Sequence, residues 1–176
     1  MKIIFLDMDG VLCVPRYNVA VNRIHERDVI DPAGVGFLNR LLEVDPTIKF
    51  VISSTWRKVY TKDELEQHLW KEGFVGEFHN DWKTGQHPKG HRGLEIQEWL
   101  KNHPEITEYI IIDDEVSDIY PYVNKKYVVH TGMYDGISMQ NFYDMNTKLF
   151  GDKAAWLDHH WNERKSQNLS TASIPL

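Results

Sequence analysis

Four short apolar runs constrain the fold of this chain more than any other feature of its 176 residues. Each run is continuous and rich in β-branched residues, whereas a strand with one solvent-facing side would alternate apolar and polar residues. Continuous runs of this length are typical of strands that are buried on both faces of a parallel sheet. The sequence therefore predicts an α/β fold whose strands are residues 2–6, 49–52, 109–112 and 127–129.

Segments with helical spacing separate these runs. Asp31 and Pro32 supply an N-cap and a first helical position, and the pattern stops before Pro46. Thr61 and Glu64 have the spacing of a capping box. The alternation of strands and helices predicts a three-layer α/β/α, Rossmann-like core with a mostly parallel sheet. Further helices are expected at about 93–102 and 138–150.

The length and the hydrophobic content of 41% suit one globular domain, which we expect to span residues 1–150. Residues 151–176 are expected to add a short helix at about 154–164 and a loose tail. The stretch 78–91 is polar and contains Gly85, Pro88 and Gly90, so it is predicted to be a loop near the active face.

Polar side chains directly follow three of the predicted strands. Ligands of an open parallel sheet bind beyond the carboxyl ends of its strands, so these side chains are candidates for the functional site. Four carboxylates gathered at one edge would repel one another unless a divalent cation neutralised them, and hard oxygen ligands suit Mg²⁺. Mg²⁺ also accepts phosphate oxygens, which favours phosphoryl chemistry. The candidates are Asp7 and Asp9, then Ser53, Ser54 and Arg57, then Asp113 and Asp114.

These residues resemble the motifs of the haloacid dehalogenase (HAD) superfamily. Residues 7–12, Asp-Met-Asp-Gly-Val-Leu, resemble its first motif, Ser53 its second and the pair Asp113-Asp114 its fourth. The order and separation of the motifs along the chain also agree. The third motif is a lysine or arginine at the start of a helix; Arg92 matches it best, with Lys89 a close competitor.

A closer resemblance is to the compact HAD domains of RNA repair (Swiss Army Knife) proteins. Three stretches carry it: Ser-Ser-Thr-Trp-Arg at 53–57, Arg-Gly-Leu-Glu-Ile-Gln-Glu-Trp-Leu at 92–100 and Gly-Ile-Ser at 136–138. The resemblance covers roughly residues 2–150 and departs from the family pattern in the loop at 78–91 and in the terminal segment.

The resemblance implies an enzyme, a Mg²⁺-dependent phosphatase that works through an aspartyl-phosphate. Asp7 would be the nucleophile, while Asp9 would protonate the leaving alcohol and then activate water. Ser53 would hydrogen-bond a phosphoryl oxygen, and Arg92 or Lys89 would offset the charge on the phosphoryl group.

The same resemblance implies a ligand set for the metal. Mg²⁺ would be held by Asp7, the backbone carbonyl of Asp9 and Asp113, with Asp114 completing the site or orienting a metal-bound water. Gly10 would let the chain turn sharply and direct backbone amides toward the phosphate. Two further residues would contact the substrate, namely Ser54 and Arg57. Asp118 is expected to cap the short helix that follows it.

The stretches where HAD enzymes carry a cap domain are short in this chain. Residues 12–31 are too few for a full cap, and 56–89 are largely used by a helix, a strand and a loop. An open site suits a bulky substrate, and the preferred one is a 3′- or 5′-phosphate on an RNA or DNA end. Two alternatives stay open: a small-molecule nucleotidase, and a non-catalytic binding module that keeps the HAD fold.

Composition limits the partners and the location. The formal net charge of −6 gives no global attraction to polyanions. No apolar run approaches the length of a membrane span, and the single cysteine, Cys13, suits a reducing cytoplasmic compartment. Trp70 and Trp99 lie on helical apolar stripes and are expected in the core, which leaves Trp56 and Trp82 as candidates for stacking on bases.

Overall fold

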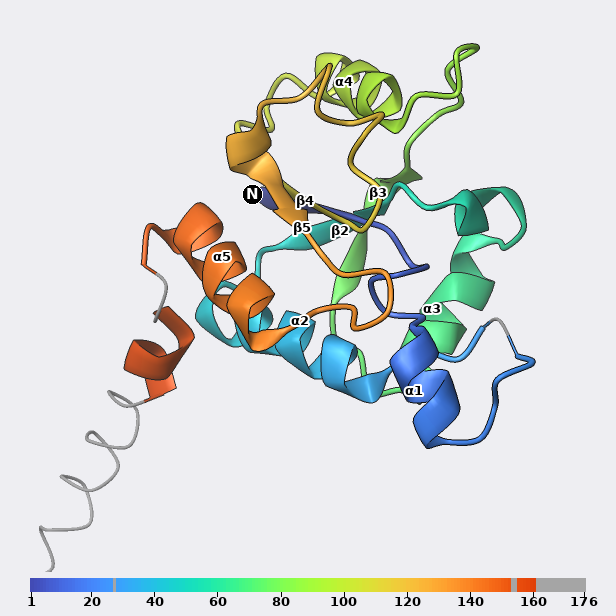
Figure 1. The fold of residues 1–176 in the computed structure, drawn as a ribbon. Helices are drawn as coiled ribbons and strands as arrows, with labels where there is room; N and C mark the ends of the chain where they lie inside the picture. Colours follow the sequence, from blue (N-terminus) through green and yellow to red (C-terminus); the bar gives the residue numbers. More distant parts are fainter. Residues whose placement is uncertain (27, 153–154, 161–176) are drawn as a thin grey trace, which may run out of the picture.

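The computed structural model describes residues 1–26, 28–152 and 155–160. Its centre is a five-stranded sheet in the order β3-β2-β1-β4-β5, in which every pairing is parallel (Figure 1). Three of the four apolar runs lie wholly in strands and the fourth, predicted at 127–129, forms a strand one residue later, so the predicted α/β fold is confirmed. The strands are β1 (Lys2–Leu6), β2 (Lys49–Ile52), β3 (Glu77–Lys83), β4 (Glu108–Asp113) and β5 (Val128–His130).

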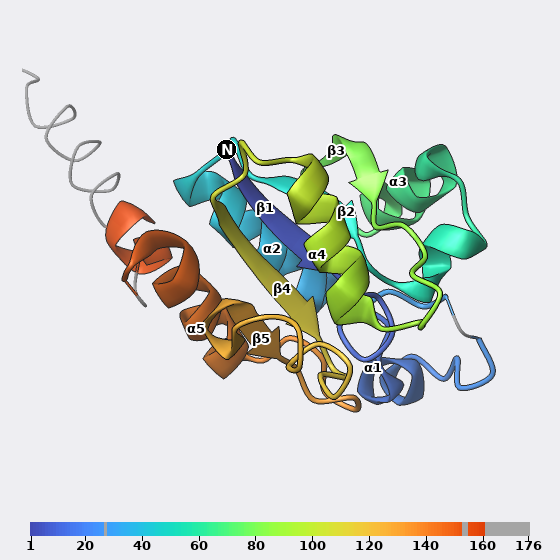
Figure 2. The same ribbon diagram turned by 90° about the horizontal axis from the view of Figure 1, so that it is seen from above.

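Helices cover both faces of the sheet and complete the three predicted layers (Figures 1 and 2). Successive side chains of β1 point to opposite faces, so Ile4 and Leu6 join one core while Ile3 and Phe5 join the other, all fully buried. Burial on both sides is why the run is continuously apolar. The first core includes α2 (Pro32–Val44), α3 (Lys62–Lys71) and α5 (Met139–Phe150), and the second includes α4 (Arg92–Asn102).

The pairing register brings the ends of three strands together. Leu6, the last residue of β1, is paired with Ile52 of β2 on one side and with Ile112 of β4 on the other. The residues that follow these positions therefore leave the sheet side by side at its carboxyl edge. These residues are Asp7, Ser53 and Asp113.

The loop predicted at 78–91 is wrong in its first part, because Glu77–Lys83 form β3. This strand lies at the edge of the sheet, where a polar sequence is tolerated, and Phe78 is its only buried residue. Trp99 is buried as expected, but Trp70 is 54% exposed. Trp70 follows Leu69 directly, so it lies about 100° around the helix from the buried stripe.

Three shorter elements complete the chain: α1 (Pro15–Ala20), η1 (Thr55–Lys58) and η2 (Lys125–Tyr127). A terminal helix is expected at about 154–164, and residues 155–160 are helical. Residues 153–154 and 161–176, which include the expected tail, lie outside the described residues. Within the described ranges, no helix is long and apolar enough to cross a membrane.

Candidate active site

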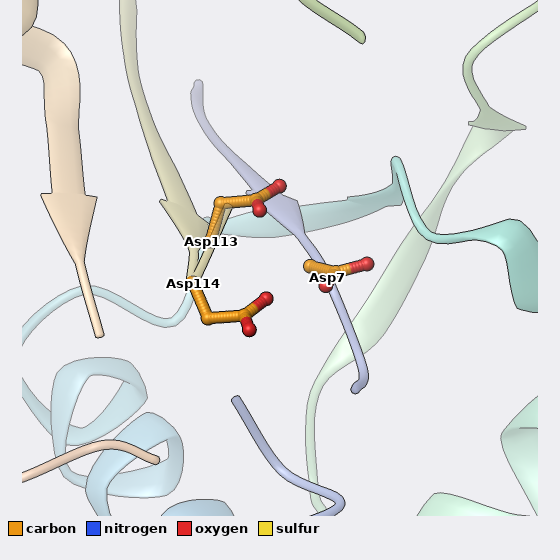
Figure 3. A group of neighbouring side chains, drawn as sticks. All are labelled: Asp7, Asp113 and Asp114. Carbon is orange, nitrogen blue, oxygen red and sulfur yellow. The ribbon is translucent and has the colours of Figure 1, made fainter. Parts of the chain in front are cut away.

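Three aspartates converge at the carboxyl edge of the sheet. Asp7 follows β1, Asp113 ends β4 and Asp114 is the next residue; Figure 3 shows the last two reaching toward Asp7. One carboxylate oxygen from each of the three lies within 4.8 Å of the others. Asp7 is 3% exposed and Asp113 is fully buried. We call these three residues the acid cluster.

Arg92 is the cation that faces the acid cluster. It is the first residue of α4, its Nη1 lies 3.3 Å from Asp7 Oδ1, and it also forms an ion pair with Asp113. Its backbone N–H donates to Asp118 Oδ2 at 2.9 Å, so Asp118 caps α4 and not the segment that follows it. Lys89 is exposed in the loop before α4. Of the two candidates for the third motif, Arg92 is therefore the one that contacts the acids.

Burial makes the acid cluster electrostatically unfavourable. It raises the pKa of Asp7 to about 6, although the Arg92 charge and hydrogen bonds from Ser54 and Met8 oppose this effect. Burial and then the negative charge of Asp7 raise the pKa of Asp113 to about 7, again against Arg92. Three carboxylates thus share one guanidinium, and their hard oxygen donors fit a divalent cation such as Mg²⁺.

Asp9 lies apart from the acid cluster. Its side chain is exposed, and its Oδ2 accepts a hydrogen bond from Trp56 Nε1 at 3.1 Å. It lines a groove whose lining residues include no member of the acid cluster. Its carboxylate is therefore held beside the acid cluster but turned toward a separate space, which suits a proton carrier more than a side-chain metal ligand.

Ser53 offers a hydroxyl that no other described residue uses. Its backbone N–H donates to the Leu6 carbonyl at 3.0 Å, which fixes the residue beside Asp7, and its side chain is fully buried. Its Oγ is one of three buried side-chain polar atoms without a hydrogen-bond partner among the described residues. A buried unsatisfied hydroxyl calls for a ligand or a water. Ser54 differs, since its Oγ accepts from the Trp56 N–H at 3.3 Å and caps η1.

Arg57 does not fit the phosphate-clamp role that the sequence predicts. It is 5% exposed, and its five N–H donors are all used: four go to backbone carbonyls and one to Glu95. No donor is left for a substrate. The carbonyls belong to Ser53, Ser54, Thr84 and Gly85, so the side chain ties the loop after β2 to the loop after β3. We call Arg57 and Glu95 the Arg57 anchor.

Gly10 creates space beside Asp114. Its φ of +67° is in the left-handed region, and a Cβ at this position would lie 2.3 Å from the Asp114 carboxyl group. Its own N–H donates to the Cys13 carbonyl at 2.9 Å, so this amide closes the loop and does not point to a ligand. The sharp turn expected at Gly10 is therefore present, and it lets Asp114 approach the chain closely.

The late Gly-Ile-Ser element at 136–138 supports the same loop. The Ile137 N–H donates to the Val11 carbonyl at 3.3 Å, and a Cβ on Gly136 would lie 2.5 Å from that oxygen. Thr131 Oγ1 donates to the Gly10 carbonyl at 3.0 Å. The segment after β5 therefore braces the loop that carries Asp7 and Asp9.

Sequence reasoning missed Glu95, which holds Arg57, and assigned Trp56 another role. Trp56 was a candidate for stacking on bases, but it is buried and its Nε1 holds Asp9. Glu95 did leave a signal, because it lies on the buried face of α4 with Ile96 and Trp99, and a carboxylate on such a face needs a buried partner. The contact between Trp56 and Asp9 joins two loops far apart in sequence and leaves no local signal.

Comparison with known proteins agrees with this arrangement. The family model described as the HAD domain in Swiss Army Knife RNA repair proteins matches residues 3–142. The match includes the acid cluster, Asp9, Ser53, Arg92 and the Arg57 anchor. No match was found among curated proteins or among solved structures.

Proposed function

Because the chain belongs to the family of HAD domains in Swiss Army Knife RNA repair proteins, we propose that it is a Mg²⁺-dependent phosphomonoesterase. The acid cluster carries this proposal. Its carboxylates are buried at the carboxyl edge of the sheet with Arg92 as their cationic partner, an arrangement that is costly unless a cation binds there. Mg²⁺ would be held by Asp7, Asp113, Asp114 and the backbone carbonyl of Asp9.

Asp7 and Asp9 divide the chemistry between them. Asp7 attacks phosphorus, the bond from phosphorus to the ester oxygen breaks, and Asp9 donates its proton to that oxygen to release the alcohol. Asp9 then takes a proton from a water molecule, which attacks the aspartyl-phosphate and releases inorganic phosphate. The bound metal supplies the positive charge that keeps Asp7 ionised and admits a phosphate dianion. The exposed position of Asp9, outside the acid cluster, supports its role as the proton carrier.

Ser53 and Arg92 would bind the phosphoryl group. The unpaired Ser53 Oγ is a hydrogen-bond donor with no other use, and Arg92 already lies 3.3 Å from the nucleophile. A preorganised donor and a fixed charge at the reacting centre lower the barrier because neither has to reorganise during the reaction. Arg57 takes no part in this step.

The substrate is proposed to be a phosphorylated nucleic-acid end, on RNA or DNA. The family supports this choice, as does the short segment between β1 and α2, whose described residues form α1 and no full cap domain. A free nucleotide is the alternative, because it presents the same phosphate and leaving group.

Phosphate release from p-nitrophenyl phosphate with Mg²⁺ tests the activity. Asp7→Asn should lower kcat by about a thousandfold or more, because the nucleophile is lost. Asp144→Asn, at a partly exposed aspartate on α5 that lies outside the acid cluster, is the matched control and should retain wild-type rates. Chelation by EDTA should abolish the wild-type activity. Equal rates for the wild type and Asp7→Asn would refute the proposal.

A substrate panel tests the nucleic-acid assignment. It compares 3′-phosphorylated RNA, 5′-phosphorylated DNA and free nucleotides at equal concentration. A nucleic-acid end should give the highest kcat/KM. Equal kcat/KM for all three would reject the preferred substrate while leaving the phosphatase reaction intact.

A further inference from the structure

A groove of about 710 Å³ is lined in part by Asp9. One wall comes from α1 and from Ile24, Glu26 and Asp28, and the other comes from Thr55, Trp56, Val59 and Tyr60. Its volume is in the range of small-molecule sites. Since Asp9 is the proposed donor of a proton to the leaving alcohol, this groove is where the leaving group must emerge.

An aromatic pair forms one wall of the groove. The rings of Trp56 and Tyr60 lie 5.1 Å apart between centroids, tilted by 44°. Each ring is held in place at its polar end, because Trp56 Nε1 donates to Asp9 and the Tyr60 hydroxyl donates to Asp28. Trp56 is only 6% exposed and belongs to the core, so it supports the partly exposed ring of Tyr60 from behind. A fixed aromatic surface of this kind binds flat or ring-shaped groups and loses little conformational entropy on binding.

The opposite wall carries an unused hydrogen-bond acceptor. Asn18, on α1, donates through Nδ2 to the Glu26 carbonyl at 2.8 Å, which fixes the orientation of its side chain. Its Oδ1 is buried and has no donor. A buried acceptor without a partner favours a bound group that brings a hydroxyl or an amine. Together with the Asp9 carboxylate, the groove therefore offers acceptors on the side that faces the leaving group.

The mouth of the groove is apolar. Ile24 is 57% exposed and Val59 is 75% exposed, and they come from opposite walls. Two large aliphatic side chains left in water across a groove gain free energy when an apolar group lies between them.

We propose that this groove binds the leaving group as a single nucleoside, with its base against the Tyr60 ring and one donor on Asn18 Oδ1. This inference rests on the proposed function. An exposed aromatic face, an apolar mouth and the unpartnered Asn18 Oδ1 together match a base joined to a hydroxyl-rich sugar, and an aliphatic alcohol would use few of these contacts. The nucleoside is the same group in a free nucleotide and at a nucleic-acid end.

The test compares one blocked groove with one matched control. Val59→Trp fills the mouth of the groove, and Val75→Trp places the same side chain at another valine that is 69% exposed and does not line the groove. With Mg²⁺, Val59→Trp should raise KM for a nucleoside monophosphate about tenfold, the equivalent of one lost base-stacking contact. Its kcat/KM for glycerol phosphate should equal that of the wild type, and Val75→Trp should match the wild type on both substrates.

The product provides a second readout. A nucleoside without phosphate should inhibit glycerol phosphate hydrolysis competitively in the wild type and in Val75→Trp, but not in Val59→Trp. A 3′-phosphorylated dinucleotide presents the nucleoside at a nucleic-acid end, and the corresponding mononucleotide presents it as a free nucleotide. Val59→Trp should raise KM for both substrates. Hydrolysis of glycerol phosphate with no nucleoside inhibition and no effect of Val59→Trp would overturn the groove assignment alone. No hydrolysis of any ester would instead overturn the proposed function.

Discussion

The acid cluster and the Arg57 anchor are two groups of buried charges that meet at Ser53 and Ser54. In the Arg57 anchor, every donor of the guanidinium has an acceptor and the one carboxylate is paired. In the acid cluster, three carboxylates share one guanidinium, and burial raises the pKa of Asp7 and Asp113. Saturated charges hold loops in place, whereas unsaturated ones leave room for a ligand. The degree of hydrogen-bond satisfaction therefore separates the structural charges from the functional ones.

The largest expected effect concerns the Arg57 anchor. Arg57→Ala should lower the free energy of unfolding by about 3–5 kcal/mol, because Glu95 would remain as a buried, unpaired charge. Glu95→Ala should have a similar effect. Denaturant unfolding measures both, and the double variant Arg57→Met/Glu95→Leu should be more stable than either single variant. A loss below about 1 kcal/mol in both single variants would show that the pair does not hold the loops.

The second-largest effect is expected at Arg92, and Lys89, the other candidate for the third motif, serves as its comparison. Arg92→Ala should lower kcat by about a hundredfold to a thousandfold, because a fixed charge on the phosphoryl group is lost. Lys89→Ala should leave kcat within about twofold, since Lys89 is exposed and its surroundings are solvent. Steady-state kinetics with saturating Mg²⁺ provides the comparison. The reverse order of effects would move the third motif to Lys89.

The smallest effect concerns the stability of the acid cluster without metal. In the folded protein, burial raises the pKa of Asp113 to about 7, well above the 3.8 of an unperturbed aspartate. The native state therefore binds more protons than the unfolded state between these values, and stability falls as the pH rises from about 4 to 7. Asp113→Asn removes this pH-dependent loss of folding stability. In EDTA at pH 8 the variant should therefore be about 1–2 kcal/mol more stable than the wild type.

Mg²⁺ should reverse that ranking. It should raise the melting temperature of the wild type and leave that of Asp113→Asn nearly unchanged, because a ligand stabilises only the state that binds it. Thermal unfolding at pH 5 and pH 8, with and without Mg²⁺, covers all four conditions. A variant that is less stable than the wild type in EDTA at pH 8 would show that the ion pair with Arg92 outweighs the repulsion.

The parts of the fold that the sequence predicts are those where burial dictates composition. β1, β2 and β4 are buried on both faces and are continuously apolar, and Asp7, Ser53 and Asp113 directly follow or end them. β3 escaped prediction because an edge strand needs little apolar surface. The choice between Arg92 and Lys89 depends on which residue begins α4, and helix ends are the least predictable feature of a helix.

The roles of side chains were harder to predict than their positions. Arg57 follows β2 closely, and a guanidinium in that sequence context is expected to bind a phosphate. Only the fold reveals that Glu95, 38 positions further along the chain, lies against Arg57. Asp9 and Trp56 present the same difficulty, since their contact depends on how two loops meet. Pairings of this kind depend on tertiary packing, about which local sequence carries little information.

The central place of β1 has a consequence for biosynthesis. This strand leaves the ribosome before its neighbours, but its two partners begin only at Lys49 and Glu108. Until β4 has been synthesised, a fully apolar strand has at least one unpaired edge that can associate with other nascent chains. The strand that leads into the acid cluster thus keeps an exposed edge through most of translation, and the acid cluster is completed only by the second half of the domain.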